Sequence, residues 1–289
     1  EAGSTVELFN GSDSLGTVTA ADNGTFSITS SVLADANYAL TVTATDEAGN
    51  TSVPSEGLSI TIDTTAPAAP VITTTTALTN DNTPTIEGTA EAGSTVELFN
   101  GSDSLGTVIA ADNGTFSITS SELADANYAL TVTATDEAGN ISDPSTGLNI
   151  TIDTTAPAAP VITTTTALTN DNTPTIEGTA EAGSTVELFN GSDSLGTVTA
   201  ADNGTFSITS SVLADANYAL TVTATDEAGN TSVPSEGLSI TIDTTAPAAP
   251  VITTTTALTN DNTPTIEGTA EAGSTVELFN GSDSLGTVI

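Results

Sequence analysis

The stretch Tyr128-Ala129-Leu130-Thr131-Val132-Thr133-Ala134-Thr135 decides the fold, because every second residue is apolar and the residues between them are mainly threonine. A period of two residues is typical of a β-strand that buries one face. We therefore expect Tyr128, Leu130, Val132 and Ala134 to point into a core. The residues between them, mainly threonines, then face solvent, and the branched threonine side chain suits an extended backbone.

Six further runs in the same part of the chain have strand composition. Valine and threonine dominate them, and Gly, Asn and Asp separate them at short intervals, as in a β-sandwich. No run has the apolar spacing of a helix. The six are 71–75, 83–89, 94–99, 105–110, 115–119 and 148–152.

These seven strands predict an all-β fold, an Ig-like sandwich of about 90 residues. Residues 77–82 are predicted to form a polar turn, and Gly106 is predicted to mark a β-bulge. Tyr128 begins its strand after a loop, as in a tyrosine corner, so its hydroxyl is expected to bond that loop.

The unit is repeated along the chain. The sequence Glu-Ala-Gly-Ser-Thr-Val-Glu-Leu-Phe-Asn begins at Glu1, Glu91, Glu181 and Glu271, which gives a period of 90 residues. This length exceeds the roughly 40 residues below which a domain usually needs disulfides or metals. We predict a tandem array with complete domains at 64–153 and 154–243. Residues 1–63 form a partial domain without its first two strands, and residues 244–289 form another with first strands only.

The copies are of two types. Residues 1–90 and 181–270 are identical, whereas the middle copy differs at six positions. Those positions are Ile109, Glu122, Ile141, Asp143, Thr146 and Asn149, which replace Thr19, Val32, Thr51, Val53, Glu56 and Ser59. The last residue, Ile289, matches Ile109, which suggests that the two types alternate. We expect the chain to be a window cut from a longer array.

A short linker joins successive domains. Ile62-Asp63-Thr64-Thr65-Ala66-Pro67-Ala68-Ala69-Pro70 recurs from Ile152 and from Ile242. Each proline fixes its own backbone and restricts the residue before it. The linker is therefore expected to be stiff and extended, and to place an aspartate where two domains meet.

The charge of the chain is one-sided, with 37 Asp and Glu residues and no Lys, Arg or His. Nothing can neutralise phosphate, so nucleic acid and anionic membrane surfaces are excluded as partners. No apolar run is long enough to insert into a bilayer, and there is no Cys. Without His, Cys or Lys to act as base or nucleophile, we do not expect an enzyme.

Acidic residues are predicted to gather at the junctions. Because strands alternate in direction, three loops should return to the end of the sandwich at which the chain arrives: 90–93, 111–114 and 136–147. The last strand ends at the opposite end, beside the next domain. Asp153 is therefore expected to meet Glu181 and Asp226 of that domain.

Carboxylates gathered without a cation suit a metal ion with oxygen ligands, and Ca²⁺ takes six to eight of them. The absence of His and Cys argues against zinc and copper. The candidate ligands are Asp63, Glu91, Asp136, Asp153, Glu181, Asp226, Asp243 and Glu271. The alternative is that these are solvated acids in turns. Asn80-Asp81-Asn82 is a weaker metal candidate, and a plain turn is the simpler interpretation.

Three motifs carry a family resemblance that covers the whole chain. They are Thr-Pro-Thr-Ile-Glu-Gly-Thr-Ala-Glu-Ala-Gly-Ser-Thr-Val, Tyr-Ala-Leu-Thr-Val-Thr-Ala-Thr-Asp-Glu-Ala-Gly-Asn and Asp-Thr-Thr-Ala-Pro. They resemble the bacterial Ig-like repeats of giant adhesins, the biofilm-associated and RTX-type proteins secreted by a type I system. The resemblance implies an extracellular spacer at the bacterial cell surface, stiffened by Ca²⁺ between domains, that supports adhesion or biofilm formation.

The partial domains at both ends suggest an alternative. Two chains could complete each other by strand complementation and build an extracellular filament or matrix fibre. The partners are then other copies of the chain as well as adjacent repeats. Binding of carbohydrate by the repeats is less favoured, because aromatic residues make up only 3% of the sequence.

Overall fold

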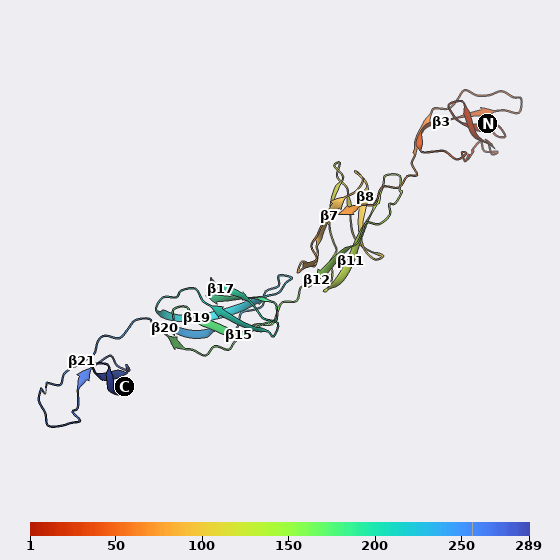
Figure 1. The fold of residues 1–289 in the computed structure, drawn as a ribbon. Helices are drawn as coiled ribbons and strands as arrows, with labels where there is room; N and C mark the ends of the chain where they lie inside the picture. The colour runs from red at the N-terminus through yellow and green to blue at the C-terminus, as the bar shows by residue number, and fades with distance from the viewer. Residues whose placement is uncertain (256) are drawn as a thin grey trace. The chain divides into compact units, whose positions relative to one another are not determined.

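The computed structural model describes residues 1–255 and 257–289, which divide into two compact units, Glu1–Thr155 and Ala156–Ile289. All regular structure in these residues is β-strand (Figure 1). Among the described residues, no helix is long and apolar enough to cross a membrane. The chain is thus an all-β protein, as the sequence predicts.

The middle repeat folds into two sheets. The smaller has the order β10-β7-β5 and the larger has the order β6-β12-β11-β8-β9. The strands are β5 (Val71–Ile72), β6 (Leu78–Thr79), β7 (Thr85–Thr89), β8 (Thr95–Asn100), β9 (Asp103–Ile109), β10 (Thr115–Thr119), β11 (Ala126–Thr135) and β12 (Leu148–Ile152).

The third repeat has the same two sheets, in the orders β13-β15-β18 and β14-β20-β19-β16-β17. Its strands are β13 (Val161–Ile162), β14 (Leu168–Thr169), β15 (Thr175–Thr179), β16 (Thr185–Asn190), β17 (Asp193–Thr199), β18 (Thr205–Thr209), β19 (Ala216–Thr225) and β20 (Leu238–Ile242).

The core of the middle repeat lies between its two sheets. Leu130, Val132 and Ala134 of β11 are fully buried, as their alternation with threonine predicts. Apolar residues of the other strands complete the core. The buried cluster comprises Ile86, Val96, Leu98, Ala110, Phe116, Ile118, Leu123, Leu130, Val132, Ile150 and Ile152. Tyr128 is half-buried against it, and its hydroxyl donates to the carbonyl of Ala124 at 2.9 Å.

The seven expected strands are present, but the turn predicted at 77–82 is wrong in part. Leu78 and Thr79 form β6, which pairs in parallel with Thr151 and Ile152 at the edge of the larger sheet. A two-residue strand has no periodicity to detect, since its pairing comes entirely from its partner. The bulge at Gly106 is confirmed, because the register between β8 and β9 shifts after the pair Leu98–Gly106.

The long loop after β11 covers the half of that strand which β12 leaves unpaired. Within β11, only residues 126–130 pair with β12. Beyond them the hydroxyl of Ser145 accepts from the amide of Val132 at 3.1 Å, and that of Ser142 accepts from Ala134 at 2.9 Å. Both serines are buried. They satisfy backbone groups that a buried strand cannot leave unpaired.

The first repeat contains the larger sheet alone, with the order β2-β1-β3-β4. Its strands are β1 (Thr5–Asn10), β2 (Asp13–Thr19), β3 (Ala36–Thr45) and β4 (Leu58–Ile62). Phe26 is 47% exposed there, whereas the equivalent Phe116 and Phe206 are 5% and 4% exposed. Residues 25–29 are not a strand, because the partner that β7 supplies to β10 is missing. The smaller sheet is therefore what closes the core.

In the last repeat, the described strands form two pairs. β21 (Val251–Ile252) pairs with β22 (Gly268–Thr269), and β23 (Val276–Asn280) pairs with β24 (Asp283–Val288).

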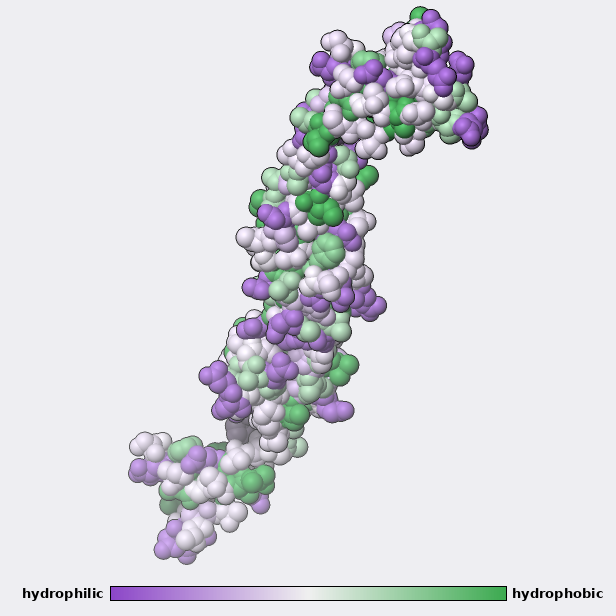
Figure 2. All heavy atoms as spheres, turned by 90° about the vertical axis from the view of Figure 1, so that its right-hand side faces the viewer, coloured by the Kyte–Doolittle hydropathy of each residue, from purple (hydrophilic) through white to green (hydrophobic). Residues whose placement is uncertain are grey.

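The six positions that separate the two repeat types are all exposed in the complete repeats. Their core residues are identical, so both types bury the same interior. Figure 2 shows apolar residues as small patches scattered among polar ones on the visible face. The variation changes the surface and leaves the fold untouched.

Gly88 of β7 lies under the ring of Phe116, its cross-strand neighbour in β10. A Cβ atom at Gly88 would stand 2.2 Å from the carbonyl oxygen of Val71 and 2.4 Å from Cζ of Phe116. Gly178 makes the same close approach to Val161 and Phe206. The neighbouring strands of the smaller sheet can approach this closely, with the phenylalanine ring over the glycine, only because the position has no side chain.

We predict that Gly88→Ala combined with Gly178→Ala destabilises the complete repeats by roughly 1–3 kcal/mol each, because the added methyl overpacks the core. Gly147→Ala combined with Gly237→Ala is the matched control, since a Cβ at either position has no contact closer than 3.9 Å. Urea unfolding followed by circular dichroism measures both. Equal midpoints for the two double variants would contradict the packing argument.

Candidate functional site

The end of each repeat is held by one aspartate of its own sandwich. Oδ1 of Asp125 accepts from the amide of Thr154 at 3.0 Å and from its hydroxyl at 2.8 Å. Oδ2 accepts from the hydroxyl of Thr155 at 2.8 Å. We call this arrangement the threonine clamp. It fixes the first two residues after Asp153 to the loop that precedes β11.

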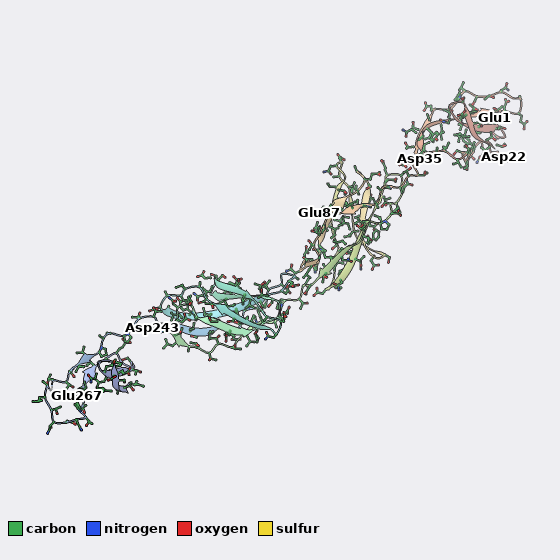
Figure 3. All side chains as sticks on the ribbon, viewed as in Figure 1. Glu1, Asp22, Asp35, Glu87, Asp243 and Glu267 are labelled. Atoms are coloured by element: carbon green, nitrogen blue, oxygen red, sulfur yellow. The ribbon has the colours of Figure 1, made fainter. Side chains whose placement is uncertain are left out.

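The threonine clamp is present in all three linkers. Asp35 holds Thr64 and Thr65 with bonds of 3.1, 2.8 and 2.8 Å. Asp215 holds Thr244 and Thr245 with bonds of 3.0, 2.7 and 2.8 Å. Figure 3 labels Asp35 where the chain leaves the first repeat.

These hydrogen bonds favour the charged carboxylate. The pKa of Asp125 is lowered below its usual 3.8, chiefly by the hydroxyl of Thr154 and then by that of Thr155. The pKa values of Asp35 and Asp215 are lowered by the equivalent threonines. Neutral donors do here what a salt bridge does in chains that contain Lys or Arg.

The sequence analysis did not identify these three aspartates as site residues. Asp125 lies in the loop that precedes Tyr128 and belongs to no recognised motif. The sequence nevertheless contains a signal, because an Asp lies 29 residues before the first threonine of each linker: Asp35 before Thr64, Asp125 before Thr154 and Asp215 before Thr244. Its role depends on β11 and β12 pairing so that Ala126 lies opposite Ile152.

A second carboxylate organises the loop at the other end of the sandwich. Oδ1 of Asp136 accepts from the amide of Asn140 at 2.8 Å, and Oδ2 accepts from its side-chain amide at 2.8 Å. The Asn140 side chain is the main cause that lowers the pKa of Asp136. At Asp226 burial raises the pKa, but the bonds from Asn230 outweigh it and the pKa is lowered.

The same asparagine reaches the preceding linker. Nδ2 of Asn140 donates to the backbone carbonyl of Asp63 at 3.0 Å. We call this bond the asparagine latch. It places the loop 136–140 of the middle repeat beside the residue that follows β4 of the first.

Several predicted metal ligands share one end of their sandwich. Thr95 pairs with Thr135, which brings the loops that hold Glu91 and Asp136 to the same end. In the third repeat Thr185 pairs with Thr225, which does the same for Glu181 and Asp226. In the first repeat the equivalent loops line a shallow hollow, and its acidic residues are Glu1, Asp46 and Glu47.

The remaining predicted ligands end a strand or occupy a turn. Asp153 and Asp243 follow β12 and β20, and their amides donate to the carbonyls of Thr79 and Thr169 at 3.0 Å. The Glu271 carbonyl accepts from the hydroxyl of Ser274 at 2.7 Å. Across residues 1–255 and 257–289, no three acidic side chains are close enough together to hold a metal ion. The meeting of Asp153 with Glu181 and Asp226 stays a prediction.

The weaker candidate at 80–82 is a turn. Oδ1 of Asp81 accepts from the amide of Thr83 at 2.9 Å and from its hydroxyl at 3.0 Å. Asn113 makes the equivalent bonds to Thr115. Both side chains stabilise their own backbone, as Asp and Asn do in turns.

The sequence of each repeat matches a known family. The model of the bacterial Ig-like domain matches residues 1–64, 72–154 and 162–244. The chain therefore belongs to the bacterial Ig-like domain family, in three tandem matches.

Two curated relatives are enzymes by name. Exoglucanase B of Cellulomonas fimi is 32% identical over 263 residues, which cover 82% of this chain and 23% of that protein. Chitinase A1 of Niallia circulans is 31% identical over 202 residues, which cover 65% of this chain and 28% of that protein. The chain thus spans about a quarter of the length of the relatives it matches.

Among solved structures, the fibronectin(III)-like modules of Clostridium thermocellum CbhA match with a TM-score of 0.41 and 19% identity. They cover 59% of this chain and 92% of that chain. The BSP domain of a biofilm-associated protein matches with a TM-score of 0.26 and 19% identity, over 73% of this chain and 43% of that chain. At these TM-scores neither likeness adds to the family assignment.

We predict that the clamps contribute to stability at neutral pH and that acid removes this contribution. A lowered pKa means that the folded state favours the carboxylate, so the contribution is present above pH 3.8 and is lost as the pH falls through the lowered value. Acid also relieves the repulsion among the other carboxylates, which changes the stability of every variant. The test therefore compares the wild type with a variant at each pH. The variant replaces Asp35, Asp125 and Asp215 with Asn.

The measurement is the thermal midpoint at about pH 7 and about pH 3 by circular dichroism. The wild type is expected to exceed the triple variant at the higher pH, and the gap is expected to narrow at the lower. The control replaces the exposed turn residues Asp22, Asp112 and Asp202 with Asn, which removes the same charge away from the linkers. A gap that does not narrow in acid would count against the assignment.

Proposed function

We propose that this chain is a structural spacer in a large bacterial cell-surface adhesin, where it supports adhesion or biofilm formation outside the cell. The observation that carries the proposal is the path of the chain through one repeat. Val71 of β5 pairs with Thr89, beside the loops 90–93 and 111–114, so the chain arrives at that end. It leaves after Ile152, which lies opposite Ala126 at the start of β11, at the other end.

A domain with its two ends at opposite poles adds length each time it is repeated. β11 has 10 residues, so at about 3.3 Å per residue each sandwich contributes roughly 30 Å or more. The repeats share one core and differ only at exposed positions, so each further repeat lengthens the chain without adding a catalytic group. The absence of His, Cys and Lys from the sequence supports the same conclusion.

Calcium at the junctions is the finer part of the proposal. Its support is the donor chemistry, since carboxylates, amide oxygens and backbone carbonyls are the only strong ligands that this sequence supplies. The candidates at the first junction are Asp63, Glu91 and Asp136. The asparagine latch lies between two of these residues. A bound ion there would neutralise repulsion between carboxylates and restrain the linker.

Small-angle X-ray scattering with and without a chelator tests the calcium part. With calcium we expect a larger maximum dimension, because restrained linkers keep consecutive repeats extended. After EGTA treatment the dimension should decrease. The same dimension in both conditions would sink calcium stiffening but would leave the spacer role intact.

A second candidate is a spacer within a polysaccharide-degrading enzyme. The identity to Exoglucanase B and Chitinase A1 favours it, because both relatives carry a matching segment within a longer protein. The complete sequence of the gene that encodes this chain distinguishes the two candidates, because it shows which domains adjoin the repeats. A glycoside hydrolase domain beside the repeats would support the enzyme, whereas further Ig-like repeats would support the adhesin.

A further inference from the structure

The linker between the first and middle repeats is held from both sides. Asp35 of the first repeat clamps Thr64 and Thr65 by three hydrogen bonds. On the far side, Pro67 and Pro70 are buried. Ala66 is the one residue between the clamped pair and the first buried proline.

The asparagine latch adds a direct bond across this linker. Asn140 belongs to the middle repeat and Asp63 to the first, and the bond joins a side-chain amide to a backbone carbonyl. The carboxylate of Asp136 orients that amide through a bond of 2.8 Å. All donors and acceptors in the clamp and the latch are protein groups, so neither needs an ion.

We propose that each linker is a joint restrained by protein hydrogen bonds, in which Asp35, Asp125 and Asp215 shorten the mobile part of the linker by clamping its two threonines. The role goes beyond the proposed spacer function, because it concerns restraint in the absence of calcium. Opening the clamp would lengthen the free segment at the first linker from Ala66 alone to residues 64–66.

Hydrogen exchange of the full chain, followed by mass spectrometry, tests the clamp directly. Pepsin digestion suits a sequence without Lys or Arg, and Asn149 distinguishes peptides of the middle linker from those of the other two. In wild type the amide of Thr154 is bonded to Asp125 and that of Thr155 to Asp153. We expect protection in this peptide both with and without EGTA.

Asp125→Ala should accelerate exchange in the peptide by about tenfold or more, because it removes a charged acceptor. Thr154→Val combined with Thr155→Val removes the two hydroxyl donors without a change of charge, and it should accelerate exchange in the same direction. Asp112→Ala removes an exposed turn carboxylate and is the matched control. Circular dichroism verifies that each variant remains folded.

Scattering in EGTA then tests the joint. The variant with Asp35, Asp125 and Asp215 replaced by Ala should have a smaller maximum dimension than wild type in the same buffer. Exchange that is unaffected by Asp125→Ala, or wild-type protection that EGTA abolishes, would overturn the clamp. Equal dimensions of the wild type and the triple variant in EGTA would overturn its role in the joint. A failure of calcium stiffening alone would affect neither result.

Discussion

This chain has no side-chain cation, so a carboxylate must be satisfied by neutral donors, by water or by a bound ion. Threonine hydroxyls and backbone amides meet that requirement at Asp125, and an asparagine meets it at Asp136. The same solution recurs on the sheet surface, where the hydroxyl of Ser104 donates to Glu97 at 2.5 Å. Acidic groups thus become fixed points of the backbone instead of members of ion pairs. Short-range hydroxyl bonds are less sensitive to salt than surface ion pairs, which are screened.

The position of these fixed points follows from strand pairing. Each clamp lies where β11 or its equivalent begins, and each Asp–Asn loop lies where that strand ends. One strand therefore sets both ends of the repeat, and its ten residues determine how far apart the clamp and the latch stand. The second half of that strand pairs with β8 on one edge, and the buried serines of the following loop bond its backbone on the other edge.

The alternation in β11 was sufficient to predict its inward residues, because periodicity reports burial directly. The all-β fold followed from seven runs of strand composition, and the tyrosine hydroxyl bond followed from the position of Tyr128 after a loop. β6 was missed because two residues carry no period and pair only through β12. Asp125 was missed because a loop aspartate reveals its partner only when two strands bring it to a linker 29 residues later. Grouping of acids at one end of a repeat could be derived from strand direction. A metal-binding geometry could not, since it depends on side-chain positions to within a fraction of an ångström.

The exposure of all six variable positions bears on how such an array can change over generations. Because the copies share one core, a recombination event that joins one copy to the equivalent point of another restores a complete sandwich. Gain or loss of whole 90-residue units would leave every remaining clamp with its own threonines, since Asp125, Thr154 and Thr155 belong to the same copy. The length of the array can therefore change by whole repeats, while the exposed residues of each repeat change independently.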